Sequence, residues 1–143
     1  MRFADTNILL YSASTDAGEQ KKAAIALALL EERDLRVSVQ VLQEFYVQAT
    51  RITRSGALTH EQAANLIRSF ILRFPVQEIT AEIVESALAT AKRFQVSYWD
   101  AAIIEAARAS GCSIVFSEDL SDGQDYNGIR VLNPFRREKA LPK

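Results

Sequence analysis

Four acidic residues from distant parts of the chain lie where carboxylates can meet in a protein of alternating strands and helices. Asp5 directly follows the apolar run RFA, and Asp119 follows a second apolar run that ends at Phe116. Glu44 and Asp100 lie in the first two turns of two predicted helices. In an open parallel sheet, sites form at the edge that the carboxyl ends of the strands and the N-terminal ends of the helices share. We therefore expect the four carboxylates to converge at this edge.

Convergence of carboxylates has an electrostatic cost that a cation can offset. Two carboxylates ~4 Å apart repel by roughly 4 kcal/mol at an effective dielectric near 20, against a total domain stability of ~5–15 kcal/mol. Carboxylate oxygens without His or Cys suit a hard ion such as Mg²⁺ or Mn²⁺ rather than zinc. Such an ion lowers the pKa of a water and stabilises charge at a phosphorus under attack. The acids therefore predict a metal site that hydrolyses phosphodiesters.

Two of the acids also have a structural interpretation as caps. Asp5 suits the cap of a turn over residues 6–11, since Asp side chains accept hydrogen bonds from the backbone N–H groups that follow. Ser97 and Asp100 have the S-x-x-D spacing of a capping box, and the acid favours the positive end of the helix dipole. Taken alone, neither acid distinguishes catalysis from capping.

The other two acids are ambiguous for different reasons. Glu44 lies on a helical stripe of polar residues, which is typical of a solvated helix face. The stripe consists of Gln40, Glu44, Gln48 and Arg51. Asp119 stands in the acidic loop SEDLSD, and Asp is common in loops without a catalytic role. Asp122 in the same loop is an alternative or additional metal ligand.

Short apolar runs rich in branched and aromatic residues alternate with longer segments of helical period. The predicted strands are Arg2 to Ala4, Leu35 to Val37, Val76 to Ile79, Ser113 to Phe116 and Arg130 to Leu132. This alternation predicts an α/β fold with three layers, in which helices cover both faces of a short central parallel sheet. No repeat or Gly/Ser-rich linker divides the 143 residues. We expect one domain over residues 1–143.

The helices that must position the acids have recognisable start and stop signals. The first is predicted from Glu19 to Glu32, and the second from Val39 to Arg54 with Ser38 as its cap. A third starts at Thr59, with Gln62 at capping-box spacing, and ends before Pro75. Its apolar stripe is Ile67, Phe70, Ile71 and Phe74. The last two helices start at Thr80, running to Phe94, and at Ser97, closing at Gly111.

The composition excludes several classes of protein. Cys112 is the only cysteine, so one chain can form neither an internal disulfide nor a cysteine zinc cluster. The N-terminus lacks the pattern of a signal peptide, and no apolar run approaches the ~20 residues that span a bilayer. We expect a cytoplasmic protein with no membrane partner. The net charge of −1 neither favours nor excludes nucleic acid, and the basic clusters are weak signals. These clusters are Arg51 with Arg54, Lys92 with Arg93, and Arg136 with Arg137 and Lys139.

Two further residues, His60 and Trp99, are candidates for a functional role by residue type. His60 is the only histidine and starts a predicted helix, which indicates an exposed residue and leaves Ser-His-Asp catalysis unsupported. Trp99 borders Asp100 and has an aromatic face on which a base could stack, but an aromatic beside a buried helix is more often core. We therefore expect Trp99 in the core.

The motifs FADTNILLY, VLQEF, SYWDAAIIEAA, FSEDL and VLNPF span nearly the whole chain. In this order and spacing they resemble the PIN-domain nucleases, especially the VapC-type toxins of bacterial toxin–antitoxin systems. The resemblance implies a PIN-like fold and an endoribonuclease that hydrolyses RNA. The residues that it assigns to catalysis and to Mg²⁺ or Mn²⁺ are Asp5, Glu44, Asp100 and Asp119. Those that it assigns to support of the ligands through hydrogen bonds are Thr6, Asn7 and Ser117.

The resemblance also implies partners. These are an RNA substrate, a small VapB-like antitoxin that covers the active site, and a second copy of the chain in a homodimer. The helical segment from Leu42 to Phe74 is our hypothesis for the surface on which the antitoxin docks.

Two other functions are compatible with the sequence. In an Asp-dependent phosphatase or phosphoacceptor domain Asp5 would be phosphorylated, but a phosphatase would have D-x-D, and Asn7 stands at the second position. A non-catalytic PIN-like module would bind RNA or protein without cutting, and it would not need all four acids. Loss of metal affinity in Asp5→Asn distinguishes the enzyme from this module.

Overall fold

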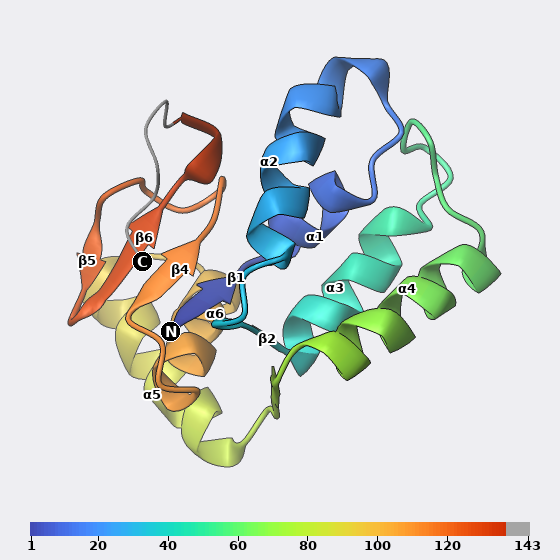
Figure 1. Cartoon of the computed structure of the whole chain (residues 1–143). Helices are drawn as coiled ribbons and strands as arrows, with labels where there is room; N and C mark the ends of the chain where they lie inside the picture. Colours follow the sequence, from blue (N-terminus) through green and yellow to red (C-terminus); the bar gives the residue numbers. More distant parts are fainter. Residues whose placement is uncertain (137–143) are drawn as a thin grey trace.

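A six-stranded sheet in the order β3-β2-β1-β4-β6-β5 forms the centre of the computed structural model, which describes residues 1–136 (Figure 1). The strands are β1 Arg2–Ala4, β2 Leu35–Ser38, β3 Val76–Gln77, β4 Ile114–Phe116, β5 Asp125–Tyr126 and β6 Ile129–Leu132. All neighbours pair in parallel except β5, which is antiparallel to β6. The five predicted strands are confirmed, and β5 is an additional two-residue edge strand.

Six α-helices connect the strands. They are α1 Thr6–Ser12, α2 Gln20–Leu30, α3 Val39–Ala49, α4 His60–Arg73, α5 Ala81–Phe94 and α6 Tyr98–Ala109. Short 3₁₀ turns lie at Ala17–Glu19 and Pro134–Arg136. The predicted caps are confirmed, because each cap side chain accepts a hydrogen bond from the backbone N–H three residues later. These caps are Ser38, Thr59, Thr80 and Ser97.

Two elements differ from the sequence expectation. The segment after Asp5 is a helix, α1, rather than a turn. Helix α3 ends at Ala49 instead of Arg54, with Thr50 as its C-cap, and the chain then turns. Arg54 consequently lies in a loop beside α1.

Helices cover both faces of the sheet, as expected for three layers. Helix α6 contacts β2, β3, β4 and β6, and α5 packs on its outer side (Figure 1). The connections through α1–α2 and α3–α4 take the chain from β1 to β2 and then to β3 at one side of the sheet. The connection through α5–α6 takes it back across the sheet to β4. Because such crossovers are right-handed, α1 and α2 lie on the face opposite α6. The site-bearing ends of β1 and β4 are therefore enclosed by helices from both layers.

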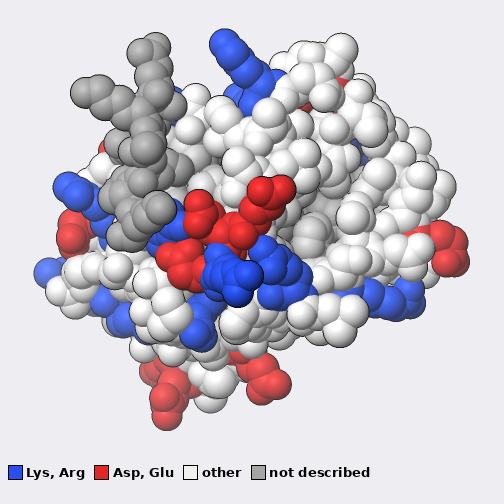
Figure 2. Space-filling view, viewed as in Figure 1, with Lys and Arg blue, Asp and Glu red and all other residues white. Residues whose placement is uncertain are grey.

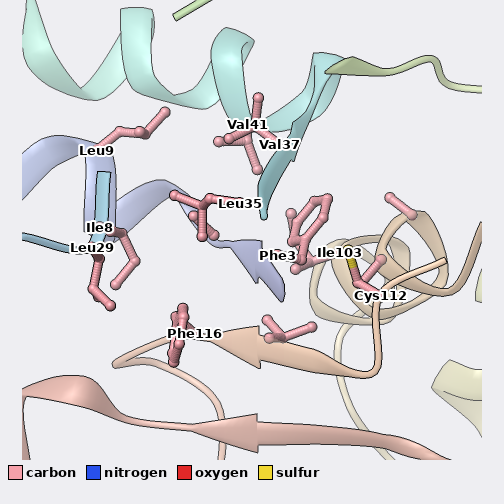
Figure 3. Close-up of a cluster of buried hydrophobic side chains, with 14 of the residues drawn as sticks. Phe3, Ile8, Leu9, Leu29, Leu35, Val37, Val41, Ile103, Cys112 and Phe116 are labelled. Atoms are coloured by element: carbon pink, nitrogen blue, oxygen red, sulfur yellow. The ribbon is translucent and has the colours of Figure 1, made fainter. Parts of the chain in front are cut away.

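The core lies between these layers. Phe3, Val115 and Phe116 of the central strands are fully buried, and Ile8 and Ile104 cover them from α1 and α6. Figure 3 shows part of this core, in which side chains of β1, β2 and β4 pack among those of α1, α3 and α6. Each such side chain contributes roughly 1.5–3 kcal/mol when fully buried. This packing fixes the strand ends from which the site is built.

Two apolar residues expected in the core are exposed instead. Trp99 is 64% exposed, because the first turn of α6 projects beyond the sheet before the helix becomes buried at Ala101. Ile71 is 52% exposed, since the helical turn that places Phe70 and Phe74 in the core directs Ile71 outward. The exposure of Trp99 shows that the expectation of a core position for this residue is wrong.

The surface features are otherwise as expected. His60 is exposed, where its ring forms a 2.9 Å hydrogen bond with Tyr46, and Cys112 is buried. On the face shown in Figure 2, acidic and basic side chains lie next to one another near the middle of the view. Over the described part of the chain, no helix is long and apolar enough to cross a membrane. Arg137 and Lys139 lie outside the described residues.

Candidate active site

Asp5 is the most deeply placed acid of the predicted set. It follows β1 and caps α1, with Oδ1 accepting a 2.7 Å hydrogen bond from the Thr6 backbone N–H. Its other oxygen, Oδ2, accepts a 2.7 Å hydrogen bond from the Ser117 hydroxyl at the end of β4. Its side chain is therefore both a cap and a member of the cluster, so the two interpretations of Asp5 do not exclude each other.

The charge of Asp5 is poorly compensated by its protein surroundings. The pKa of Asp5 is raised to about 7, mainly by burial and to a smaller extent by the nearby charges of Asp119 and Glu44. The hydrogen bonds from Ser117 and Thr6 act in the opposite direction but do not offset the burial. Strongly perturbed carboxyls of this kind cluster at functional sites.

Glu44 is held in place through both of its carboxylate oxygens. The Thr6 hydroxyl donates to Oε2 at 2.8 Å, and the Gln40 amide donates to Oε1 at 2.9 Å. The same Gln40 amide nitrogen lies 3.2 Å from the backbone carbonyl of Trp99. Gln40 therefore connects α3 to the first turn of α6. Glu44 faces the cluster and is not part of a fully solvated helix face.

Asp119 is oriented by the residue two positions after Asp5. The Asn7 amide donates to Oδ2 of Asp119 at 3.2 Å, and the Asn7 carbonyl oxygen accepts from the Glu118 backbone N–H at 3.3 Å. The backbone N–H of Asp119 donates to the Ser117 hydroxyl oxygen at 3.2 Å. The predicted supporting residues Thr6, Asn7 and Ser117 thus contact three of the four acids.

The two other acids of the SEDLSD loop point to different partners. Glu118 accepts 2.5 Å hydrogen bonds from the Tyr11 hydroxyl and from the Lys22 ammonium. Asp122 accepts a 2.8 Å hydrogen bond from the Asn133 backbone N–H. The loop therefore directs Asp119 to Asn7 and directs Asp122 to the chain that follows β6.

Asp100 lies across the cluster from Asp5, in the first turn of α6. It is half-buried, and this burial raises its pKa, with the charges of Asp119 and Glu44 raising it further. A hydrogen bond with Ser97 opposes the shift. The charges of Asp119 and Glu44 thus act on both Asp5 and Asp100, which indicates that the four acids form one electrostatic group.

Two hollows meet at Glu44. One has a volume of about 290 Å³ and lies between α1, α3 and the loop after β4, with Thr6, Asn7 and Asp119 in its wall. The other, of about 460 Å³, lies between α3 and α6 and has Trp99 and Asp100 in its wall. Glu44 lines both hollows, so this acid is reachable from two sides, whereas Asp100 lines one hollow and Asp119 the other.

The chemistry of these donors fits a hard divalent cation. Among residues 1–136, no set of three or more His, Cys, Asp or Glu side chains forms a metal cage by itself. Mg²⁺ does not require a cage, because it binds through one or two carboxylates together with waters and substrate phosphates. Asp5, whose pKa is raised mainly by burial and further by two neighbouring acids, is a group whose charge a cation would stabilise.

Gln40 is the residue that sequence reasoning missed. The sequence placed it on a solvated polar stripe, whereas it is buried and links Glu44 to α6. Its spacing of four residues before Glu44 puts the two side chains on one helix face. This spacing was the sequence signal for Gln40, because it is as compatible with contact between Gln40 and Glu44 as with a solvated helix face.

The comparisons with known proteins identify the domain. The family model described as PIN domain matches residues 2–121. No curated protein is similar enough in sequence to count as a match.

Several solved structures share the fold. VapC20 of Mycobacterium tuberculosis, described as a Sarcin-Ricin loop cleaving toxin, is 20% identical over 83% of this chain and 90% of that one, with a TM-score of 0.65. A toxin–antitoxin complex from Klebsiella pneumoniae is 21% identical over 94% and 98%, with a TM-score of 0.65. FitAcB from Neisseria gonorrhoeae is 19% identical over 96% and 100%, with a TM-score of 0.66. At these identities the likeness establishes the fold.

Proposed function

This chain belongs to the PIN domain family, and on that premise we propose that it is an endoribonuclease dependent on Mg²⁺ or Mn²⁺. The observation that carries the proposal is the buried Asp5 carboxylate, whose pKa of about 7 reflects burial beside the charges of Asp119 and Glu44. Burial of an acid beside two other acids costs stability that its cap of α1 only partly offsets, and such perturbed groups cluster at functional sites. In a nuclease, the negative charge of Asp5 would bind the cation that contacts the phosphodiester.

The residues that would hold the ion are Asp5, Asp100 and Asp119, with Glu44 as a further ligand or as an acid of the catalytic set. When bound, the cation supplies Lewis acidity, which makes an attacking water more acidic and offsets negative charge on the phosphodiester. Asp122 is left outside this set because it binds the Asn133 backbone N–H after β6, whereas Asp119 binds Asn7 and Ser117 beside Asp5.

The surrounding residues keep the carboxylates in place as acceptors. Ser117 and the Thr6 backbone occupy one hydrogen bond on each oxygen of Asp5, which leaves the remaining lone pairs available to a ligand. Thr6 and Gln40 do the same for Glu44. Such partners fix ligand orientation, and their loss typically costs 10–100-fold in metal affinity or activity.

The fold supports a more specific role, that of the toxin in a toxin–antitoxin pair. Structures of the same fold are described as toxins or as toxin–antitoxin complexes. We propose that this chain acts in the cytoplasm on RNA, forms a homodimer, and is inhibited by a small VapB-like antitoxin. Expression of the wild-type chain alone should then arrest growth, and Asp5→Asn should not.

Cleavage of RNA by the purified protein tests the proposal. We expect single-stranded or loop RNA to be cut in the presence of Mg²⁺ or Mn²⁺, and cutting to stop when the metal is chelated. Asp5→Asn and Asp100→Asn should lose activity, whereas Asp122→Asn should retain it. Cleavage that persists in Asp5→Asn contradicts the proposal. Metal-independent binding of uncut RNA would instead identify a non-catalytic PIN-like module.

A further inference from the structure

Trp99 is a large aromatic side chain with no place in the core. It is 64% exposed, although it stands between Tyr98 and the acid Asp100 in the first turn of α6. The Tyr98 ring contacts it at a centroid distance of 5.2 Å with the ring planes 82° apart. Gln40 also holds the Trp99 backbone carbonyl. The indole is therefore positioned by its neighbours while much of its surface remains open.

The open surface of Trp99 faces the hollow of about 460 Å³ between α3 and α6. Glu44 and Asp100 belong to the same wall, so the hollow begins at the acidic cluster. Val47, which is 56% exposed, adds an apolar surface from α3. The hollow is therefore continuous with the candidate active site and has both an aromatic and an aliphatic surface.

Two amides in this hollow are available to a ligand. The side chains of Gln43 and Gln48 line it, and neither forms a hydrogen bond with any group in the described part of the chain. Gln40, by contrast, is occupied by Glu44 and the Trp99 carbonyl. A carboxamide presents both donors and an acceptor, which is the chemistry that recognises the edge of a base.

Away from its two acids, the lining of the hollow suits a base better than a phosphate. Glu44 and Asp100 belong to the proposed metal site, and no other charged side chain of residues 1–136 lines the hollow. A nucleobase is neutral, stacks on aromatic rings and forms hydrogen bonds with amides. An unpaired base is the part of an RNA chain that matches all these features.

We propose that this hollow is a subsite for one unpaired nucleobase adjacent to the phosphodiester that is cut, with Trp99 as its stacking surface. The inference rests on the proposed ribonuclease function and adds to it a named binding site for one unpaired base beside the cut. Gln43 and Gln48 contact the base edge, and Gln40 keeps the indole next to Glu44.

Kinetics of Trp99 variants test the subsite. Base stacking is worth about 1–3 kcal/mol per base, so Trp99→Ala should raise KM for RNA roughly 5- to 150-fold with a much smaller change in kcat. Trp99→Phe should recover most of the lost affinity. Leu72→Ala removes another exposed apolar side chain, 89% exposed on α4, and should leave KM unchanged. Circular dichroism confirms that each variant is folded.

Fluorescence provides a direct reading, because Trp99 is the only tryptophan in the chain. RNA titrated into the inactive Asp5→Asn protein should change the Trp99 emission in step with binding, which is followed by anisotropy of a labelled RNA. Oligonucleotides with a single abasic site, scanned across the cut, should bind more weakly at one position. In Trp99→Ala, an abasic site at that position should no longer weaken binding.

The outcomes separate the subsite from the function on which it rests. Wild-type protein that cuts no RNA contradicts the proposed function and the subsite with it. Cleavage by wild type together with an unchanged KM in Trp99→Ala contradicts the subsite alone. A change in oligomeric mass in Trp99→Ala, with KM unchanged, also overturns the subsite and assigns this face to contact between two copies.

Discussion

The hydroxyl of Ser117 donates a 2.7 Å hydrogen bond to Oδ2 of Asp5, and this contact joins the ends of β1 and β4. From β1 the sheet continues to β2 and β3 on one side, and to β4 and β6 on the other. Ligands in α/β folds bind at such a reversal of strand order. The same hydroxyl accepts from the backbone N–H of Asp119 at 3.2 Å, so Ser117 positions both acids.

Asp5→Asn should make the metal-free protein more stable at alkaline pH. The folded protein holds the Asp5 proton up to about pH 7, whereas an unfolded chain releases it near 3.8. Between these values the folded state binds more protons, so wild-type stability falls as the pH rises from about 4 to 7. Urea unfolding in chelator should show the variant up to about 4 kcal/mol more stable at pH 8, and little different at pH 4. An equal difference at both pH values would contradict this assignment of the charge.

Asp119→Asn should reduce activity, whereas Asp122→Asn should reduce stability. Asp119 faces the cluster through Asn7, so its loss should abolish most activity. Asp122 holds the Asn133 backbone N–H, so its loss should lower stability by about 1 kcal/mol and leave activity near wild type. Parallel cleavage assays and thermal unfolding measure both effects. Activity lost only in Asp122→Asn would identify Asp122 as the fourth acid instead.

Gln40→Leu should weaken metal binding without disrupting the fold. The change removes the donor to Oε1 of Glu44 and the link to the Trp99 carbonyl. Loss of such an orienting partner typically costs 10–100-fold in metal affinity or activity. Gln20→Leu makes the same substitution at an exposed position of α2 and serves as the matched control. If the two variants bind Mn²⁺ equally well, Gln40 does not position the site.

Lys22→Met should lower stability slightly, in a pH-dependent way. Burial opposes ionisation of Glu118, but hydrogen bonds from Lys22 and Tyr11 hold the pKa of Glu118 below its ordinary value. This contribution is present at neutral pH and is lost as the pH falls through the pKa of Glu118. Because Lys22 is partly exposed, we expect a loss below about 1 kcal/mol at pH 7 and almost none at pH 3. Lys21→Met, at the adjacent exposed position, should show neither effect.

The sequence predicted the strands and caps well because both depend on short-range chemistry. Apolar runs such as RFA form buried strands, and Thr59 with Gln62 forms the predicted capping box. The two-residue β5 was missed because it is too short to show periodicity, although Asn127-Gly128, both at positive φ, is a dipeptide typical of the hairpin turn that joins β5 to β6. The sequence placed Trp99 in the core because it cannot show where α6 emerges from its neighbours.

The acids of the site were predictable as a set but not their contacts. Parallel topology places strand ends and helix starts together, which is enough to associate Asp5 with Asp119. The choice between Asp119 and Asp122 required coordinates, because both lie in one loop and only the fold decides which neighbour each meets. The contact of Gln40 with the Trp99 carbonyl likewise depends on the packing of α3 against α6, whereas its contact with Glu44 could be expected from their spacing.

Calorimetric titration of Mn²⁺ tests most directly whether the acidic cluster is a metal site. Wild type, Asp5→Asn and Asp122→Asn are compared at pH 7.5, with folding of each confirmed beforehand. Binding should be weakened at least ~10-fold in Asp5→Asn and unchanged in Asp122→Asn. Equal Mn²⁺ affinity in wild type and Asp5→Asn would contradict the account.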